Sequence, residues 1–166
     1  MNVQRFVNMP NALKPLVLLF ILLTMLLAAS SPGKSPSGGW FFWLNITVQF
    51  VFITAVCAMF LYECEAFLTL GRDGGWPIVE MSYSGVGAFC NFVNIFILAA
   101  GHKTEVEKES NTFMVAAFSA FFLTIFYCVG GLMMFRIWRG FIKSGASQNP
   151  TPNVRAGDIG GMHPGV

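Results

Sequence analysis

Four long runs of apolar residues, separated by short polar stretches, dominate the chain. They cover about residues 15–31, 40–62, 77–100 and 112–135, and each is bounded by charged residues, proline or glycine. A helix needs roughly 20 consecutive apolar residues to cross the hydrocarbon core of a bilayer. The runs do not alternate polar with apolar residues, as the strands of a membrane barrel do. The pattern predicts an all-α, integral membrane four-helix bundle that runs up, down, up and down.

This interpretation divides the chain into three parts. Residues 1–14 form an N-terminal segment, residues 15–143 the membrane domain and residues 144–166 a tail. The tail is rich in glycine, proline, serine and asparagine, and such a segment cannot bury enough apolar surface to fold alone. We therefore expect a flexible tail.

The first apolar run leaves an alternative open. It is short, it follows basic residues, and it ends in the small residues Ala28, Ala29 and Ser30, which is typical of a cleaved signal peptide. A signal peptide seldom has so long a segment before its apolar run, and here that segment also contains Pro10. We therefore retain four spans.

The composition agrees with a membrane protein. Hydrophobic residues make up 55% of the chain and charged residues 11%, against about 25% charged residues in a typical soluble domain. The mean hydropathy is +0.63. These values argue against a soluble enzyme, a disordered chain and a nucleic-acid-binding protein. The net charge of +2 is too small to indicate a polyanionic partner.

The basic residues predict the orientation of the bundle, because cytoplasmic flanks of membrane helices carry an excess of Lys and Arg. With both termini in the cytoplasm, seven basic residues lie on that side and three on the other. The cytoplasmic seven are Arg5, Lys14, Arg72, Arg136, Arg139, Lys143 and Arg155, and the other three are Lys34, Lys103 and Lys108. We therefore predict that both termini are cytoplasmic.

The residue types that usually carry chemistry are sparse. Cys57, Cys90 and Cys128 fall inside the apolar runs, and the chain has no CxxC pair and only two histidines. No zinc-ligand spacing, nucleophile–base grouping or phosphate-binding loop is present. We predict no catalytic residues, no metal site and no cofactor. Cys64 follows the second run directly, so it is a candidate palmitoylation site or else a small buried hydrophobe.

The ionisable residues gather at helix boundaries, in loops and in the tail. Glu80 falls in the first turn of the third predicted helix, where a negative charge is favourable beside the helix dipole. Lys14 is assigned to the flank before the first run. A proton-coupled carrier needs an ionisable group well inside a span, so this class of protein is disfavoured.

Uncharged amides are more informative because they lie inside the runs. Asn45 and Gln49 share one helix face, and so do Asn91 and Asn94. The two pairs have matching depths, and an unpaired amide in hydrocarbon is costly. We predict that Gln49 contacts Asn91 and that Asn45 lies near Asn94. Their role is to hold the helices together, or alternatively to line a polar cavity for a lipid headgroup or an ion.

Small residues predict where helices approach closely. Packing of small side chains drives association of helices in lipid. The candidate residues for such contacts, either within the bundle or between protomers, are Ser84, Gly85, Gly87 and Ala88 in the third run and Gly130 and Gly131 in the fourth.

In the third run, residues 76–80 read WPIVE, residues 84–88 read SGVGA and residues 98–101 read LAAG. With these residues the run resembles the third helix of MARVEL-domain proteins, the four-span group that includes the myelin-and-lymphocyte, chemokine-like-factor and synaptic gyrin and physin proteins. The likeness extends over about residues 14–143. The first outer loop is shorter than in the physin and occludin branches, and it lacks their cysteines and the Trp and paired Cys of claudins.

The resemblance implies a non-enzymatic role in vesicle trafficking, membrane apposition or cell-junction assembly at the plasma membrane or a vesicle membrane. The implied partners are membrane lipids and other integral membrane proteins, in homo- or hetero-oligomers, and no nucleic acid. The alternative is an accessory transmembrane subunit of a channel, pump or receptor complex.

Overall fold

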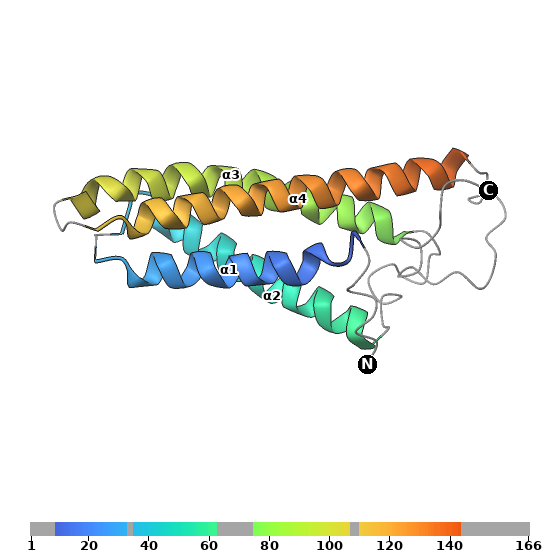
Figure 1. Ribbon diagram of the computed structural model, residues 1–166, viewed down its shortest axis with the longest axis horizontal. Coiled ribbons are helices and arrows are strands. Elements are labelled where there is room, and N and C mark those ends of the chain that lie inside the picture. The colour runs from blue at the N-terminus through green and yellow to red at the C-terminus, as the bar shows by residue number, and fades with distance from the viewer. Residues whose placement is uncertain (1–8, 33–34, 63–74, 107–109, 144–166) are drawn as a thin grey trace.

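The computed structural model describes residues 9–32, 35–62, 75–106 and 110–143. These ranges contain four helices, α1 (Leu13–Ser30), α2 (Gly39–Tyr62), α3 (Trp76–Val106) and α4 (Thr112–Lys143), and no strand (Figure 1). All four helices are long and apolar enough to cross a membrane. The prediction of an all-α chain with the properties of a multi-pass membrane protein is confirmed.

The helices extend beyond the apolar runs at several ends. Helix α3 continues to Val106 and α4 to Lys143, whereas the runs end near residues 100 and 135. Lys, Arg and Glu are good helix formers, so the end of an apolar run marks the edge of the hydrocarbon rather than the end of the helix. Helix α1 begins at Leu13, and Lys14 therefore belongs to the helix rather than to its flank.

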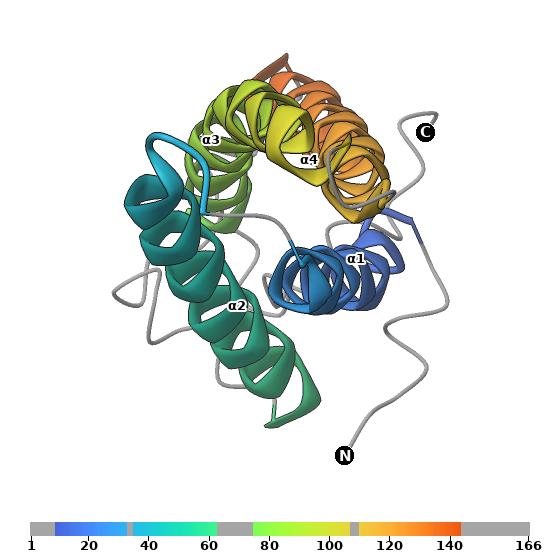
Figure 2. The same ribbon diagram turned by 90° about the vertical axis from the view of Figure 1, so that its left-hand side faces the viewer.

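The four helices differ in how closely they pack. Helices α3 and α4 lie side by side and make the most extensive contact, followed by α1 with α4 (Figures 1 and 2). Helix α2 crosses the others at a marked angle, as the end-on view shows (Figure 2). It contacts α3 less extensively than it contacts α1. Because this contact is small, the polar contacts between α2 and α3 supply a larger share of what holds these two helices together.

Contacts at the two ends establish how the helices run past one another. At one end, the ring of Phe60 near the end of α2 lies 4.9 Å from the ring of Trp76 at the start of α3. Met134 of α4 packs in the same apolar cluster. At the other end, a Cβ on Gly101 of α3 would lie 3.2 Å from Pro36, which precedes α2. Helices α2 and α3 are therefore antiparallel.

The outer surface of the bundle is apolar. Many large hydrophobic side chains remain exposed on every helix, in contrast to the few small apolar patches of a soluble monomer. Examples are Leu19 and Leu26 on α1, Leu44 and Val51 on α2, Phe89 and Phe96 on α3, and Phe118 and Leu132 on α4. Such a surface suits contact with lipid chains or with other membrane helices.

Candidate functional site

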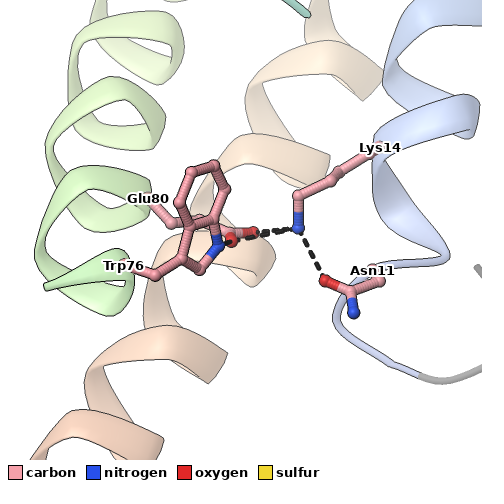
Figure 3. Close-up of polar contacts among 4 residues, drawn as sticks. All are labelled: Asn11, Lys14, Trp76 and Glu80. Atoms are coloured by element: carbon pink, nitrogen blue, oxygen red, sulfur yellow. Dashed lines mark hydrogen bonds and ion pairs between the residues drawn. The ribbon is translucent and has the colours of Figure 1, made fainter. Parts of the chain in front are cut away.

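A buried ion pair joins the starts of α1 and α3. The Nζ atom of Lys14 donates hydrogen bonds to Oε1 and Oε2 of Glu80 at 2.8 and 3.0 Å. It also donates to Oδ1 of Asn11 at 2.8 Å. Nε1 of Trp76 donates to Oε2 of Glu80 at 2.7 Å (Figure 3). We call Asn11, Lys14, Trp76 and Glu80 the end cluster.

The charged side chains of the end cluster are almost completely buried. The side chains of Lys14 and Glu80 are 3% and 4% exposed, and Lys14 Nζ also lies 4.5 Å from the centre of the Phe60 ring. Charges in a region of low dielectric persist only when they are paired and hydrogen-bonded. The acceptors around Lys14 match the three N–H groups of an ammonium. The end cluster therefore holds the starts of α1 and α3 together, in contact with Phe60 near the end of α2.

Two sequence-based expectations are corrected here. Glu80 is the fifth residue of α3, so it lies beyond the first turn, and its charge is balanced by Lys14 rather than by the helix dipole. Lys14 lies inside α1 and is buried. The sequence holds one hint of the pair, namely an acid and a base expected at the same edge of the membrane. It does not show that α1 and α3 come together there.

The four amides form a row between α2 and α3. Nδ2 of Asn91 donates to Oε1 of Gln49 at 2.7 Å, which is the contact that depth matching predicts. Nε2 of Gln49 donates in turn to Oδ1 of Asn45 at 2.7 Å. Nδ2 of Asn94 donates to Oδ1 of Asn91 at 3.5 Å, which is a weak bond. We call these four residues the amide row.

The outer members of the amide row, Asn45 and Asn94, form their hydrogen bonds within their own helices, and their predicted proximity stays a prediction. Among the described residues, Nδ2 of Asn45 and Oδ1 of Asn94 are buried without a hydrogen-bond partner, so the two side chains do not bond to each other. Each bonds instead to the amide one turn away on its own helix. Depth matching locates residues along the membrane normal, but it cannot locate them around the helix axis.

Replacing Asn91 by leucine tests the central bond of the amide row. We expect a loss of about 0.6–2 kcal/mol, typical of hydrogen bonds between membrane helices, because Gln49 then lacks its partner. The double change Gln49→Leu and Asn91→Leu should be no worse than the worse single change, since leucine is stable in lipid. Unfolding in mixed detergent micelles measures the stability of the single and double variants, with Thr47→Leu on the exposed face of α2 as the control. A double variant that is clearly worse than either single variant would contradict a pairing role.

The small residues separate into an inner and an outer group. A Cβ on Gly87 would lie 2.9 Å from the ring of Tyr127, and a Cβ on Gly131 would lie 3.3 Å from Cβ of Ser84. These residues form the close contact between α3 and α4. The predicted close-packing role therefore holds for Ser84, Gly87 and Gly131.

The other small residues have different surroundings. A Cβ on Gly130 would lie 3.7 Å from Leu13, so this glycine faces α1. Ala88 is half-buried and packs against the main apolar core. Gly85 is exposed, and a Cβ there would meet nothing within 4 Å. Gly85 makes no close contact within the bundle, because it lies on the opposite side of α3 from Gly87, and a contact between protomers stays a prediction.

One polar contact between helices was not expected from the sequence. The hydroxyls of Thr24 on α1 and Ser119 on α4 lie 2.7 Å apart and share a hydrogen bond. Thr24 also donates to the carbonyl oxygen of Phe20. Thr and Ser in apolar helices commonly bond to the preceding turn of their own helix. Their presence in a run is therefore a poor guide to contacts between helices.

The cysteines offer no grouped chemistry in the part of the chain that the structure describes. Cys57 and Cys90 are half-buried thiols, and Cys128 is exposed. Within the described ranges, no three His, Cys, Asp or Glu side chains come close enough together to hold a metal ion. Cys64, the candidate palmitoylation site, lies outside the described residues.

Comparison with protein-family models, with curated proteins and with solved structures gives no match for this chain. The resemblance to MARVEL-domain proteins stays a prediction that rests on the residues quoted for the third helix.

Proposed function

We propose that this chain is a non-enzymatic, MARVEL-like tetraspan membrane protein that organises membranes through lateral packing of its helices. Its setting is vesicle trafficking, membrane apposition or cell-junction assembly, at the plasma membrane or a vesicle membrane. One observation carries the proposal: large apolar side chains cover the outside of all four helices, while the end cluster and the amide row face inward. A protein with this distribution meets its neighbours in the membrane through apolar contact.

The internal polar contacts support the same role. The end cluster joins α1 to α3, and the amide row joins α2 to α3. Hydrogen bonds and small residues hold membrane helices together where the hydrophobic effect supplies little driving force. The bundle can therefore present its outer faces to membrane lipids and to other integral membrane proteins while keeping a defined shape.

Assembly in the membrane tests the proposal. Two full-length copies with different tags are expressed together, extracted in mild detergent and analysed by co-purification and native mass measurement. We expect each copy to recover the other in a homo-oligomer. A stoichiometric complex with one larger channel, pump or receptor, without association between the two copies, would contradict the proposal and favour the role of accessory subunit.

The proposed topology places both termini in the cytoplasm. The end cluster lies at the same end of the bundle as Met134, two residues before Arg136, so Lys14 and Arg136 share that end. Tags at Met1 and Val166 should both be protected, or both be cleaved, when protease is added to one side of sealed vesicles. Lys34 and Lys103 should lie on the opposite side. Opposite behaviour of the two tags would indicate an odd number of spans, as would follow from cleavage of the first apolar run.

A further inference from the structure

The amide row ends in two atoms of complementary character. Asn45 Nδ2 carries two N–H donors and Asn94 Oδ1 is an acceptor, and neither has a hydrogen-bond partner among the described residues. Buried polar groups are nearly always paired, because leaving one unpaired in apolar surroundings costs free energy. A ligand that satisfies both atoms must accept from Asn45 and donate to Asn94.

Both atoms belong to the same stretch of the interface between α2 and α3. The stretch is bounded on one side by the central bond of the amide row. It is bounded on the other side by Gly38, where a Cβ would lie 3.6 Å from Ile97. Asn45 lies between these limits on the first of the two antiparallel helices, and Asn94 lies between them on the second. The two side chains therefore lie at the same level of one interface.

The depth of this stretch points to the boundary between lipid headgroups and chains. Trp43 is 37% exposed, and exposed tryptophans of membrane helices concentrate at that boundary. Asn45 follows Trp43 by two residues, which is about 3 Å along the helix axis. Asn45 is also half-buried, whereas Asn94 is fully buried. The lipid-facing edge of the site is therefore at Asn45.

The surroundings select a neutral ligand. Helix α2 contains no Asp, Glu, Lys, Arg or His, and the nearest such residue after Asn94 on α3 is His102, eight residues away. The ion pair of the end cluster lies at the opposite end of the bundle and is already balanced. A phosphate or carboxylate would therefore be buried without a counter-charge, which is costly.

We propose that Asn45 and Asn94 bind the free hydroxyl of a neutral acyl lipid of the diacylglycerol type. The hydroxyl donates its hydrogen to Asn94 Oδ1, and its oxygen accepts one N–H of Asn45. The second N–H of Asn45 bonds to the adjacent ester carbonyl. Both amide atoms are covered by protein, so the lipid enters by displacing a side chain at the α2–α3 interface. The site rests on the proposed bilayer placement, not on a role in organising membranes.

Photolabelling of the full chain in phosphatidylcholine vesicles tests the site. One set of vesicles carries a photoreactive diacylglycerol and a second carries its methyl ether, which keeps the oxygen acceptor but cannot donate to Asn94. We expect the hydroxyl lipid to label the wild type roughly fivefold more than the ether, the effect of about one hydrogen bond.

Variants of the two amides separate their roles. Asn94→Leu should label equally with the hydroxyl lipid and the ether, because the acceptor is gone. Asn45→Leu should lower labelling by both lipids and leave their ratio unchanged. Thr54→Val is the matched control, since Thr54 is exposed on α2 and bonds only to the carbonyl of Phe50 in the described part of the chain. Thr54→Val should change neither the labelling by the two lipids nor the ratio between them.

Three results would overturn the site. The first is equal labelling of the wild type by the hydroxyl lipid and the ether, which is also what a water molecule between the amides would produce. The second is labelling by a photoreactive cholesterol as strong as that by diacylglycerol, because cholesterol has a hydroxyl but no carbonyl. The third is an unchanged lipid preference in Asn94→Leu. Co-purification of tagged copies from the same vesicles is scored separately, so loss of self-association with retained labelling counts only against the proposed function.

Discussion

Replacing Lys14 by methionine is expected to destabilise the bundle by about 3–5 kcal/mol, the usual cost of removing one partner of a buried ion pair. The change leaves the Glu80 carboxylate at 4% exposure without the ammonium that balances its charge, although Trp76 still donates to it (Figure 3). Glu80→Leu should be similarly severe, because it removes the carboxylate that balances the buried ammonium, and contacts such as those to Asn11 and the Phe60 ring supply no negative charge. Unfolding in mixed detergent micelles, followed by tryptophan fluorescence, measures the loss.

The double variant tests whether the stability of the bundle depends on the pairing of the two charges or only on the volume of the two side chains. Lys14→Met with Glu80→Leu removes both charges together, so we expect it to recover most of the stability lost in either single variant. Lys103→Met is the matched control, since Lys103 is exposed near the opposite end of the bundle, and it should change stability by no more than about 0.5 kcal/mol. A double variant as unstable as the single variants would contradict the ion-pair explanation.

The second large effect is expected at the contact between α3 and α4. Gly87→Leu should destabilise the bundle by about 1–3 kcal/mol or more through overpacking. The reason is that a Cβ at Gly87 already lies 2.9 Å from the ring of Tyr127, and that ring is 4% exposed and held in the core. The same unfolding measurement applies, and co-purification of tagged copies reports whether assembly is affected.

Gly85 supplies a control on the same helix. Gly85→Leu adds the same side chain where nothing lies within 4 Å, and leucine is a better helix former than glycine by somewhat under 1 kcal/mol. We therefore expect no loss of stability, and a small gain if lipid surrounds this face. Tyr127→Ala combined with Gly87→Leu should recover part of the loss, because it removes the ring that the new side chain meets. Equal damage from Gly85→Leu and Gly87→Leu would show that glycine itself, rather than the close contact, is required.

The amide row shows which contacts between helices can be predicted from the depth of residues in the membrane. Gln49 and Asn91 were paired correctly because a bilayer orders residues along one axis and consecutive helices tend to be neighbours. The same reasoning placed Asn45 near Asn94, and the hydrogen bonds of both side chains in the structure go to amides on their own helices. Depth is encoded by position in a run, whereas rotation about the axis depends on how the helices pack.

The hydrophobic pattern by itself determined the four membrane helices, because the bilayer imposes length and apolarity on each helix separately. The tertiary structure alone decided what depends on two helices at once. Lys14 and Glu80 lie 66 residues apart and on helices that are not consecutive, so no local sequence pattern predicts their ion pair. Likewise Gly85 and Gly87 are both small and both in α3, but two residues correspond to about 200° of rotation. Only the packing of α4 against one side of α3 makes Gly87 an inner residue and Gly85 an outer one.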